Sequence, residues 1–195
     1  MFNQLSAIVF VALISLSCSQ YTSRGQCNGR DRSYVSAVQF FNLERFARNG
    51  APWYPVISYS NDNGDCQTVS FTVTGSRTMD VVYTNKNLAT GISSTKEAKV
   101  TWQPVSYLSA VLRLDSSDLA DSLVFKVIGM VYDEFTIIYR CVDLDKQNRQ
   151  EFLYVMGRNS SLTSAQQASV NQILEARNLN GTQVNIIQDS TICSS

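Results

Sequence analysis

The feature that most constrains the fold is a series of short β-rich runs from Trp53 to about Val155. Polar or glycine-containing breaks separate the runs, and none is long and periodic enough for a crossover helix, which favours antiparallel neighbours. After WYPVISY come CQTVSFTVTG, RTMDVVYTNK, KEAKVTWQP, YLSAVLRLD, LVFKVIGMVYD, EFTIIYRCVD and EFLYVMGR, with β-branched and aromatic residues at alternate positions. Eight such strands in up-and-down order can close into a barrel whose mouth holds one small ligand.

A helical pattern follows the strands. The segment SAQQASVNQILEAR, Ser164 to Arg177, places apolar side chains at helical spacing, with Thr163 or Ser164 as the N-cap. Its apolar stripe must cover something, most simply the outer wall of the sheet, and a short strand, QVNIIQ, comes after it. We therefore predict an all-β fold, an eight-stranded antiparallel up-and-down β-barrel with one C-terminal α-helix packed on the barrel. A β-sandwich is the competing architecture.

The beginning of the chain is typical of a secretory leader. MFNQLSAIVFVALISLSC has no charged side chain and contains an apolar run of suitable length. We expect residues 1–20 to be a cleaved signal peptide and residues 21–195 to be a single domain, secreted to the extracellular space. A membrane anchor is the alternative, but the run is short for about 30 Å of hydrocarbon, and no later run is long enough to span a membrane. A bacterial lipoprotein anchor at Cys18 is a third possibility.

The cysteine count indicates disulfides. Without Cys18, four cysteines remain, namely Cys27, Cys66, Cys141 and Cys193. An even number in a secreted chain predicts two disulfides, and the spacing leaves all three pairings open. No C-x-x-C pair occurs, so structural bridges are favoured over a metal site.

Charge and histidine content narrow the functions. Sixteen basic residues balance sixteen acidic ones, so no long-range attraction to nucleic acid or anionic lipid is expected. There is no histidine, which removes Ser-His and Cys-His dyads and histidine ligands for metal or haem. Asp and Glu are present, but no carboxylate pair stands out. We expect no enzyme activity, no cofactor and no metal.

Three segments, in order, resemble the lipocalins, in particular the branch of apolipoprotein D, insecticyanin and the bilin-binding protein. NLERFARNGAPWYPVISY, residues 42–59, resembles the family's helical turn and the Gly-x-Trp-Tyr start of its first strand. VYDEFTIIYRC, residues 131–141, is similar to the Thr-Asp-Tyr segment that leads into the seventh strand. EFLYVMGRNSSLTSAQ, residues 151–166, resembles the eighth strand, its terminal arginine and the turn into the helix.

The resemblance implies roles for particular residues. Trp53 would plug the closed end of the barrel, and Arg158 would lie across its indole as a cation–π partner. The implied disulfides are Cys27–Cys141 and Cys66–Cys193, which pin both tails to the barrel wall.

Alternation along the strands predicts the lining of the interior, with charged residues marking the outer face and Ile57 and Tyr59 sharing the parity of Trp53. Val69, Phe71, Thr136 and Ile138 follow from the register of the family. The predicted ligand-binding residues are Ile57, Tyr59, Val69, Phe71, Val81, Tyr83, Trp102, Leu112, Phe125, Ile138, Tyr154 and Met156. A barrel filled by its own side chains is the alternative.

The resemblance and the apolar lining point to a secreted carrier that binds a small hydrophobic molecule non-covalently: a lipid, fatty acid, sterol or bilin-type pigment. The alternative is a ligand-poor scaffold that binds a protein partner or receptor through its open-end loops, such as that around residues 61–65. An enzyme resembling prostaglandin D synthase would need a free cysteine in the barrel, whereas all four cysteines match disulfide positions. Asn159 and Asn180 stand in N-x-S/T sequons and are candidate glycosylation sites.

Overall fold

The elements of the computed structural model follow the predicted order. In chain order they are β1 (Gln20–Arg24), α2 (Leu43–Ala47), η1 (Arg48–Gly50), β2 (Tyr54–Ser58), β3 (Asp65–Gly75), β4 (Thr78–Lys86), β5 (Ser93–Trp102), β6 (Val111–Asp115), β7 (Leu123–Val131), β8 (Phe135–Asp143), β9 (Asn148–Gly157), α3 (Ser164–Ala176), β10 (Val184–Asn185) and α4 (Ser190–Cys193). The structure describes residues 20–28, 35–59, 65–117, 121–179 and 181–193. The predicted leader up to residue 19, residues 61–64 of the predicted open-end loop and the sequon asparagine Asn180 lie outside the described residues.

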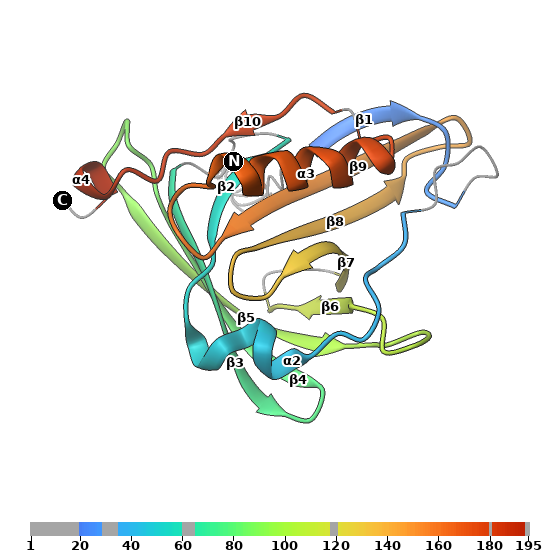
Figure 1. Ribbon diagram of the computed structural model, residues 1–195, viewed down its shortest axis with the longest axis horizontal. Helices are drawn as coiled ribbons and strands as arrows, with labels where there is room; N and C mark the ends of the chain where they lie inside the picture. Colours follow the sequence, from blue (N-terminus) through green and yellow to red (C-terminus); the bar gives the residue numbers. More distant parts are fainter. Residues whose placement is uncertain (1–19, 29–34, 60–64, 118–120, 180, 194–195) are drawn as a thin grey trace, which may run out of the picture.

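The strands form one antiparallel sheet in the order β10-β2-β9-β8-β7-β6-β5-β4-β3, and β1 pairs with β9. A bridge between Trp53, next to β2, and Val69 of β3 joins the two edges of this strand order, with backbone N to O distances of 2.8 and 2.9 Å. The sheet therefore curls and closes, as Figure 1 shows. The predicted eight-stranded barrel is confirmed as β2 to β9.

β1 is an element that the sequence did not reveal. Its five residues, QYTSR, are mostly polar and carry no apolar alternation. Residues 20–24 pair with residues 148–152 of β9, next to the stretch 154–157 that pairs with β2. The strand forms because β2 leaves this length of the β9 edge unpaired, and an unpaired edge accepts a further strand.

The barrel wall separates two apolar clusters. The inner cluster includes Trp53, Phe71, Met79 and Val127. The outer cluster, which includes Ile137, Leu153 and Val155 of the wall, lies under α3 and contains its buried Val170 and Leu174. The predicted docking of the helix on the outer wall is confirmed (Figure 1).

Local chemistry explains where α3 begins and how closely it packs. Thr163 is the N-cap: its Oγ1 accepts the N–H of Gln166, and the Gln166 side chain accepts the N–H of Thr163. On β7, a Cβ added to Gly129 would lie 3.0 Å from Cδ1 of Ile173 and 3.1 Å from Cδ1 of Ile137. Glycine at this position therefore lets the helix approach the sheet.

The four cysteines of the barrel domain form two disulfides. Cys27 is bonded to Cys141 with an S–S distance of 2.05 Å, and Cys66 to Cys193 with 2.09 Å, which is the pairing that the resemblance implies. The first bond attaches the segment after β1 to β8, and the second attaches α4 to β3. Within the described ranges, no helix has the length and apolar character needed to cross a membrane.

Candidate functional site

One end of the barrel is closed by Trp53, whose side chain is 0% exposed. Phe46 of α2 packs against it, with ring centroids 5.6 Å apart, and the indole Nε1–H donates to the Phe46 carbonyl oxygen at 3.1 Å. On the other side, Cζ of Arg158 lies 3.5 Å from the Trp53 ring centroid. The expected plug and its cation–π partner are both present at this end.

Arg158 also ties three segments together at the closed end. Its guanidinium donates to the carbonyl oxygens of Phe46 at 2.7 Å, Ala51 at 3.0 Å and Tyr132 at 3.2 Å. Burial, with a contribution from the nearby charge of Arg48, lowers the pKa of Arg158 to about 10. These structural contacts engage all three nitrogens of the guanidinium, so this arginine closes the barrel.

Above a buried row of side chains near the plug, burial of the inward-facing residues decreases toward the open end, although Trp102 and Met130, nearer the closed end, are also only partly buried. The level next to the plug is buried on every strand from β4 to β9: Met79, Val100, Leu112, Val127, Thr136 and Met156. Two residues further along each strand toward the open end, most inward-facing side chains are only partly buried: Ala98, Leu114, Phe125, Ile138 and Tyr154. Val81 is still buried at this position on β4. An inward-facing side chain that solvent reaches must border free space. The interior is therefore filled near Trp53 and accessible above it.

The accessible half is apolar with a few polar atoms. Tyr83 of β4 and Tyr154 of β9 place phenol rings there. Deeper, Oγ1 of Thr136 is buried and has no hydrogen-bond partner among the described residues. A buried hydroxyl without a partner costs about 1–3 kcal/mol, so a water or a polar ligand atom at this depth would be stabilised.

Ten of the twelve predicted lining residues face the interior. Eight are in the inner cluster: Val69, Phe71, Val81, Trp102, Leu112, Ile138, Tyr154 and Met156. Tyr83 pairs across strands with Val69, and Phe125 with Leu112, so both share that face.

The interior positions predicted for Ile57 and Tyr59 are wrong. Both belong to the outer cluster, with Leu153 and the buried face of α3. The register of β2 on β9 shifts between Pro55 and Ile57, so Pro55 pairs with Met156 but Ile57 with Val155. Such a bulge adds one residue to β2 and turns every later side chain to the other face. Nothing in the alternation of the sequence revealed it.

Two inward-facing cations were missed by the sequence reasoning. Lys96 pairs with Tyr83, and Arg140 pairs with Phe152, next to the interior residues Ile138 and Tyr154. Each shares the parity of apolar lining residues on its own strand. The alternation was therefore visible, but the assumption that charged side chains mark the outer face concealed these two positions.

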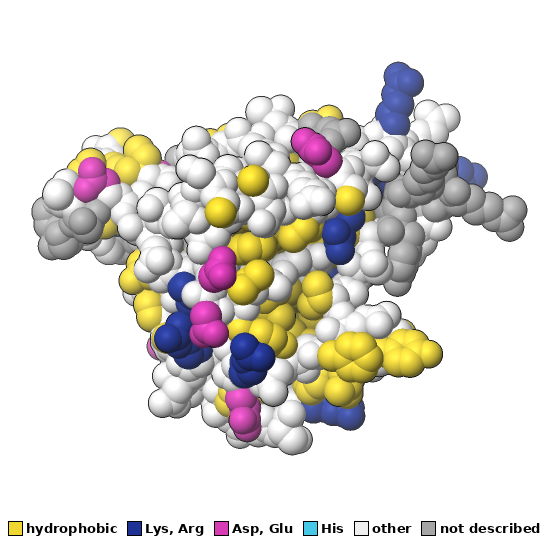
Figure 2. All heavy atoms as spheres, viewed as in Figure 1, with side chains coloured by type: hydrophobic (Ala, Val, Ile, Leu, Met, Phe, Trp, Pro, Cys, Tyr) yellow, Lys and Arg dark blue, Asp and Glu magenta, His cyan; other side chains and the backbone are white. Residues whose placement is uncertain are grey.

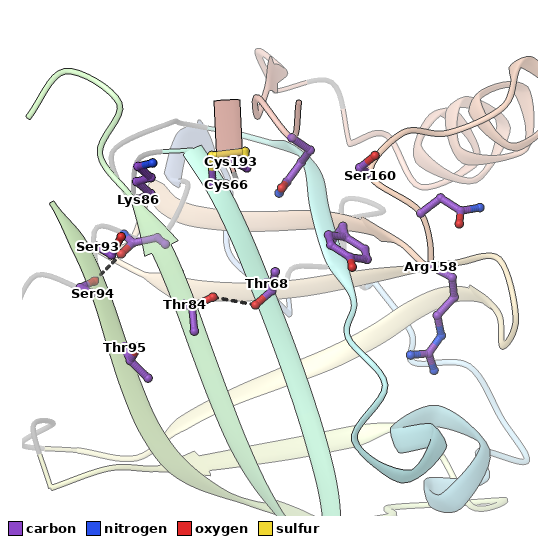
Figure 3. A pocket seen from close by; sticks show the side chains of 14 residues that line it. Cys66, Thr68, Thr84, Lys86, Ser93, Ser94, Thr95, Arg158, Ser160 and Cys193 are labelled. Carbon is purple, nitrogen blue, oxygen red and sulfur yellow. Dashed lines mark hydrogen bonds between the residues drawn. A yellow bond between two sulfur atoms is a disulfide. The ribbon is translucent and has the colours of Figure 1, made fainter. Parts of the chain in front are cut away.

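The structure has a second concavity outside the barrel. It is a groove of about 600 Å³ between the outer face of β3–β5 and the C-terminal segment, lined by Tyr54, Cys66, Thr68, Thr84, Asn85, Lys86, Ser93, Ser94, Thr95, Arg158, Asn159, Ser160, Gln188 and Cys193. Figure 3 shows its hydroxyls side by side on neighbouring strands. Thr68 and Thr84 bond each other at 2.6 Å, and Gln188 donates to two backbone carbonyls. These bonds engage some of its polar groups.

The described residues were compared with the side-chain groups that bind metals or provide a free thiol. Within the described ranges, no group of three or more His, Cys, Asp or Glu side chains could hold a metal ion. All four described cysteines are in disulfides.

Comparison with solved structures identifies the architecture. The structure is similar to insecticyanin from the tobacco hornworm Manduca sexta, with a TM-score of 0.72 over 89% of this chain and 92% of that one, at 16% sequence identity. It is also similar to lobster apocrustacyanin A1, with a TM-score of 0.70 over 88% and 93%, at 17% identity. The chain has the lipocalin fold.

This lipocalin barrel also resembles a biogenic amine-binding protein, with a TM-score of 0.54 over 73% of this chain and 79% of that one, at 15% identity. The sequence matches no protein-family model and no curated protein. At these identities the likeness establishes the lipocalin fold alone, and the ligand has to be argued from the side chains in the barrel.

Proposed function

We propose that the protein is a secreted carrier that binds a small hydrophobic molecule non-covalently in the open half of the barrel. The stepwise decrease in burial above Trp53 carries this proposal, because it leaves accessible apolar side chains on five strands facing a common interior. An apolar ligand there would gain about 25 cal/mol per Å² of buried apolar area. Tyr83, Tyr154 and the unpaired hydroxyl of Thr136 supply orientation.

Other observations support the same proposal. The lipocalin fold is shared with a protein named for binding a small molecule, a biogenic amine. Two disulfides are typical of extracellular proteins, and the apolar segment at the start of the chain is typical of a secretory leader.

The test is to purify the secreted protein from a eukaryotic host, extract it with organic solvent and identify the extract by mass spectrometry. We expect one stoichiometric apolar compound, or an empty barrel that binds the neutral fluorescent probe N-phenyl-1-naphthylamine. A matched pair locates the site: Ile138→Ala faces the interior, whereas Ile57→Ala faces α3. An empty protein that also fails to bind the probe contradicts the carrier function.

A scaffold function is the second candidate, and one surface favours it. Phe40, Val105, Tyr107 and Leu108 are 71%, 83%, 71% and 51% exposed. They form an apolar protrusion at the closed end, where the N–H of Phe40 donates to the Tyr107 carbonyl. Figure 2 shows hydrophobic side chains gathered at the loop between β5 and β6. Exposed apolar patches mark interaction surfaces. A protein partner would therefore contact this end of the barrel.

This scaffold alternative predicts that Tyr107→Ser with Leu108→Ser abolishes capture of a partner from the native fluid. Probe binding in the barrel should be unaffected. If the double variant captures the same partner as the native protein, the protrusion is not the contact surface.

We further propose that Asn159 carries an N-linked glycan. Its side chain is exposed just after β9, on the rim of the outer groove. Asn159→Gln should lower the mass of the secreted protein by one glycan, and digestion of the native protein with an amide-cleaving glycosidase should remove at least that mass. Equal masses before and after digestion contradict the proposal.

A further inference from the structure

The outer groove, of about 600 Å³, has a row of threonines as its floor. Thr68 of β3 pairs across strands with Thr84 of β4, and Thr84 pairs with Thr95 of β5. All three line the groove, and Figure 3 shows them side by side on the three strands. Neighbouring strands lie about 4.8 Å apart, so hydroxyl and methyl groups recur along the floor at that spacing. The floor can therefore contact a ligand that extends across all three strands.

One wall of the groove is the C-terminal segment, which covalent and hydrogen bonds hold in place. Cys193 is bonded to Cys66 of β3. Nε2 of Gln188 donates to the carbonyl oxygens of Pro55 on β2 at 2.7 Å and of Gln67 on β3 at 2.8 Å. Because these bonds are made within the protein, the groove keeps its shape without a ligand, and binding does not have to order its wall.

The groups that the groove leaves available to a ligand are neutral. Its two cations have protein partners: Nζ of Lys86 donates to the Ile192 carbonyl at 3.5 Å, and the guanidinium of Arg158 donates to backbone carbonyls at the closed end. Its lining contains no carboxylate among the described residues. Four of its hydroxyl side chains take part in no hydrogen bond within the described part of the chain: Tyr54, Ser93, Thr95 and Ser160. A hydroxyl both donates and accepts, so this lining suits a neutral ligand rich in hydroxyls, which is a sugar.

One residue of the lining can carry a sugar chain. Asn159 begins the sequon Asn159-Ser160-Ser161, is exposed, and makes no side-chain hydrogen bond within the described ranges. It follows β9 directly and lines the groove together with its neighbours Arg158 and Ser160. A glycan attached to its amide nitrogen would begin at the edge of the groove. The tether would then keep the sugars at a high effective concentration beside the hydroxyls.

We propose that the outer groove is an oligosaccharide-binding site and that its occupant is the glycan of Asn159, folded back so that its core sugars lie on the threonine floor. This inference rests on the glycosylation of Asn159 proposed above and is independent of the carrier function. The sugar hydroxyls exchange hydrogen bonds with Tyr54, Ser93 and Thr95, and the apolar faces of the sugar rings contact the threonine methyl groups. The glycan then covers this part of the outer wall of the barrel.

The test measures how fast an endoglycosidase that cuts between the two core N-acetylglucosamines releases the glycan. The protein carries Thr182→Ala, which removes the second sequon, and is secreted from a eukaryotic host that adds high-mannose glycans. Intact mass gives the cleavage rate. We expect the folded protein to be cut about tenfold more slowly than the reduced and unfolded protein, because a tethered glycan at millimolar effective concentration stays mostly bound even at a Kd of about 0.1 mM.

Variants then assign the protection to the groove. Ser93→Ala with Thr95→Val removes two hydroxyls that bond nothing in the described part of the chain, so cleavage of the folded protein should accelerate about tenfold with no loss of structure. Thr72→Val is the matched control, since Thr72 is exposed on the same face of β3 as Thr68 and does not line the groove. Its cleavage rate should equal that of the unmodified protein.

Nuclear Overhauser contacts provide a second, direct readout. In the glycoprotein with an unmodified groove, the methyl groups of Thr84 and Thr95 should show contacts with sugar protons, whereas the methyl group of Thr72 should show none. If the double variant does not fold by circular dichroism, this measurement decides alone.

The possible failures are distinguishable. A secreted protein with the mass of the bare polypeptide overturns both the glycosylation and the groove inference. Equal cleavage rates with and without the double substitution, an equal acceleration by Thr72→Val, or no contact of sugar protons with Thr84 and Thr95 overturns the groove inference while the glycosylation stands. The carrier function is unaffected by each of these outcomes, because the neutral probe tests it inside the barrel.

Discussion

The hydroxyl of Tyr139 donates a 2.7 Å hydrogen bond to Oε1 of Glu151, in a buried polar cluster beneath β1. Oε2 of the same carboxylate accepts from Ser23 of β1 at 2.8 Å, and Arg149 lies 3.3 Å from Oε1. Burial, followed by the bond to Glu151, raises the pKa of Tyr139, so the phenol stays protonated as a donor. The cluster links β1 to β8 and β9.

Glu151→Gln should loosen β1. The amide can satisfy some partners, but Arg149 loses its buried counter-charge, so we expect the free energy of unfolding to fall by about 1–3 kcal/mol. Hydrogen exchange of the amides at residues 20–24 should accelerate more than exchange in β5. Glu97→Gln, exposed on β5, is the control and should change stability by less than about 0.5 kcal/mol. Unchanged protection of β1 contradicts this role.

Arg158→Met should destabilise the closed end of the barrel. The methionine keeps part of the packing on Trp53 but removes the donor to the Ala51 carbonyl, and it leaves the Phe46 carbonyl with the indole N–H of Trp53 in place of two donors. We expect a loss of about 2–4 kcal/mol in urea unfolding. Arg113→Met, on the outer face of β6, provides the comparison. Equal effects of the two substitutions would show that the contact with the indole contributes nothing specific.

The Ile57 and Ile138 pair tests the bulge in β2. Ile57→Ala removes a buried side chain from the outer cluster, so it should cost about 2–4 kcal/mol and leave the affinity of the folded protein for the neutral probe unchanged. Ile138→Ala faces the interior and should lower that affinity severalfold with a smaller loss of stability. Reversed effects on affinity would show that β2 has no register shift.

Removal of either disulfide should lower stability by a similar amount. The linked cysteines are 114 and 127 residues apart, so loop closure restricts the unfolded chain almost equally. Replacing each pair by serine should cost about 2–5 kcal/mol, measured by thermal unfolding. An unchanged melting temperature after complete reduction would contradict a structural role for these bonds.

The regular part of the fold was predictable because its signals are local. Period-two runs predicted β2 to β9, and Thr163 with the following apolar spacing predicted α3 almost to the residue. The resemblance supplied what local signals cannot, namely the disulfide pairing and the contact of Arg158 with Trp53. The predictions from sequence failed where the position of a strand depends on its pairing with another strand. The two cases are the shifted register at Ile57 and the polar strand β1, which both pair with β9.

The sequence by itself determined which segments become strands and helix, since alternation, capping and turn residues act over a few neighbours. It also determined that histidine chemistry is absent. Only the tertiary structure decided which face of β2 lies inside, because a single bulge inverts that choice, and which cations lie in the barrel. Lys96 and Lys99 are on one strand and of one residue type. Alternation places them on opposite faces of β5, and closure of the sheet makes the face of Lys96 the interior one.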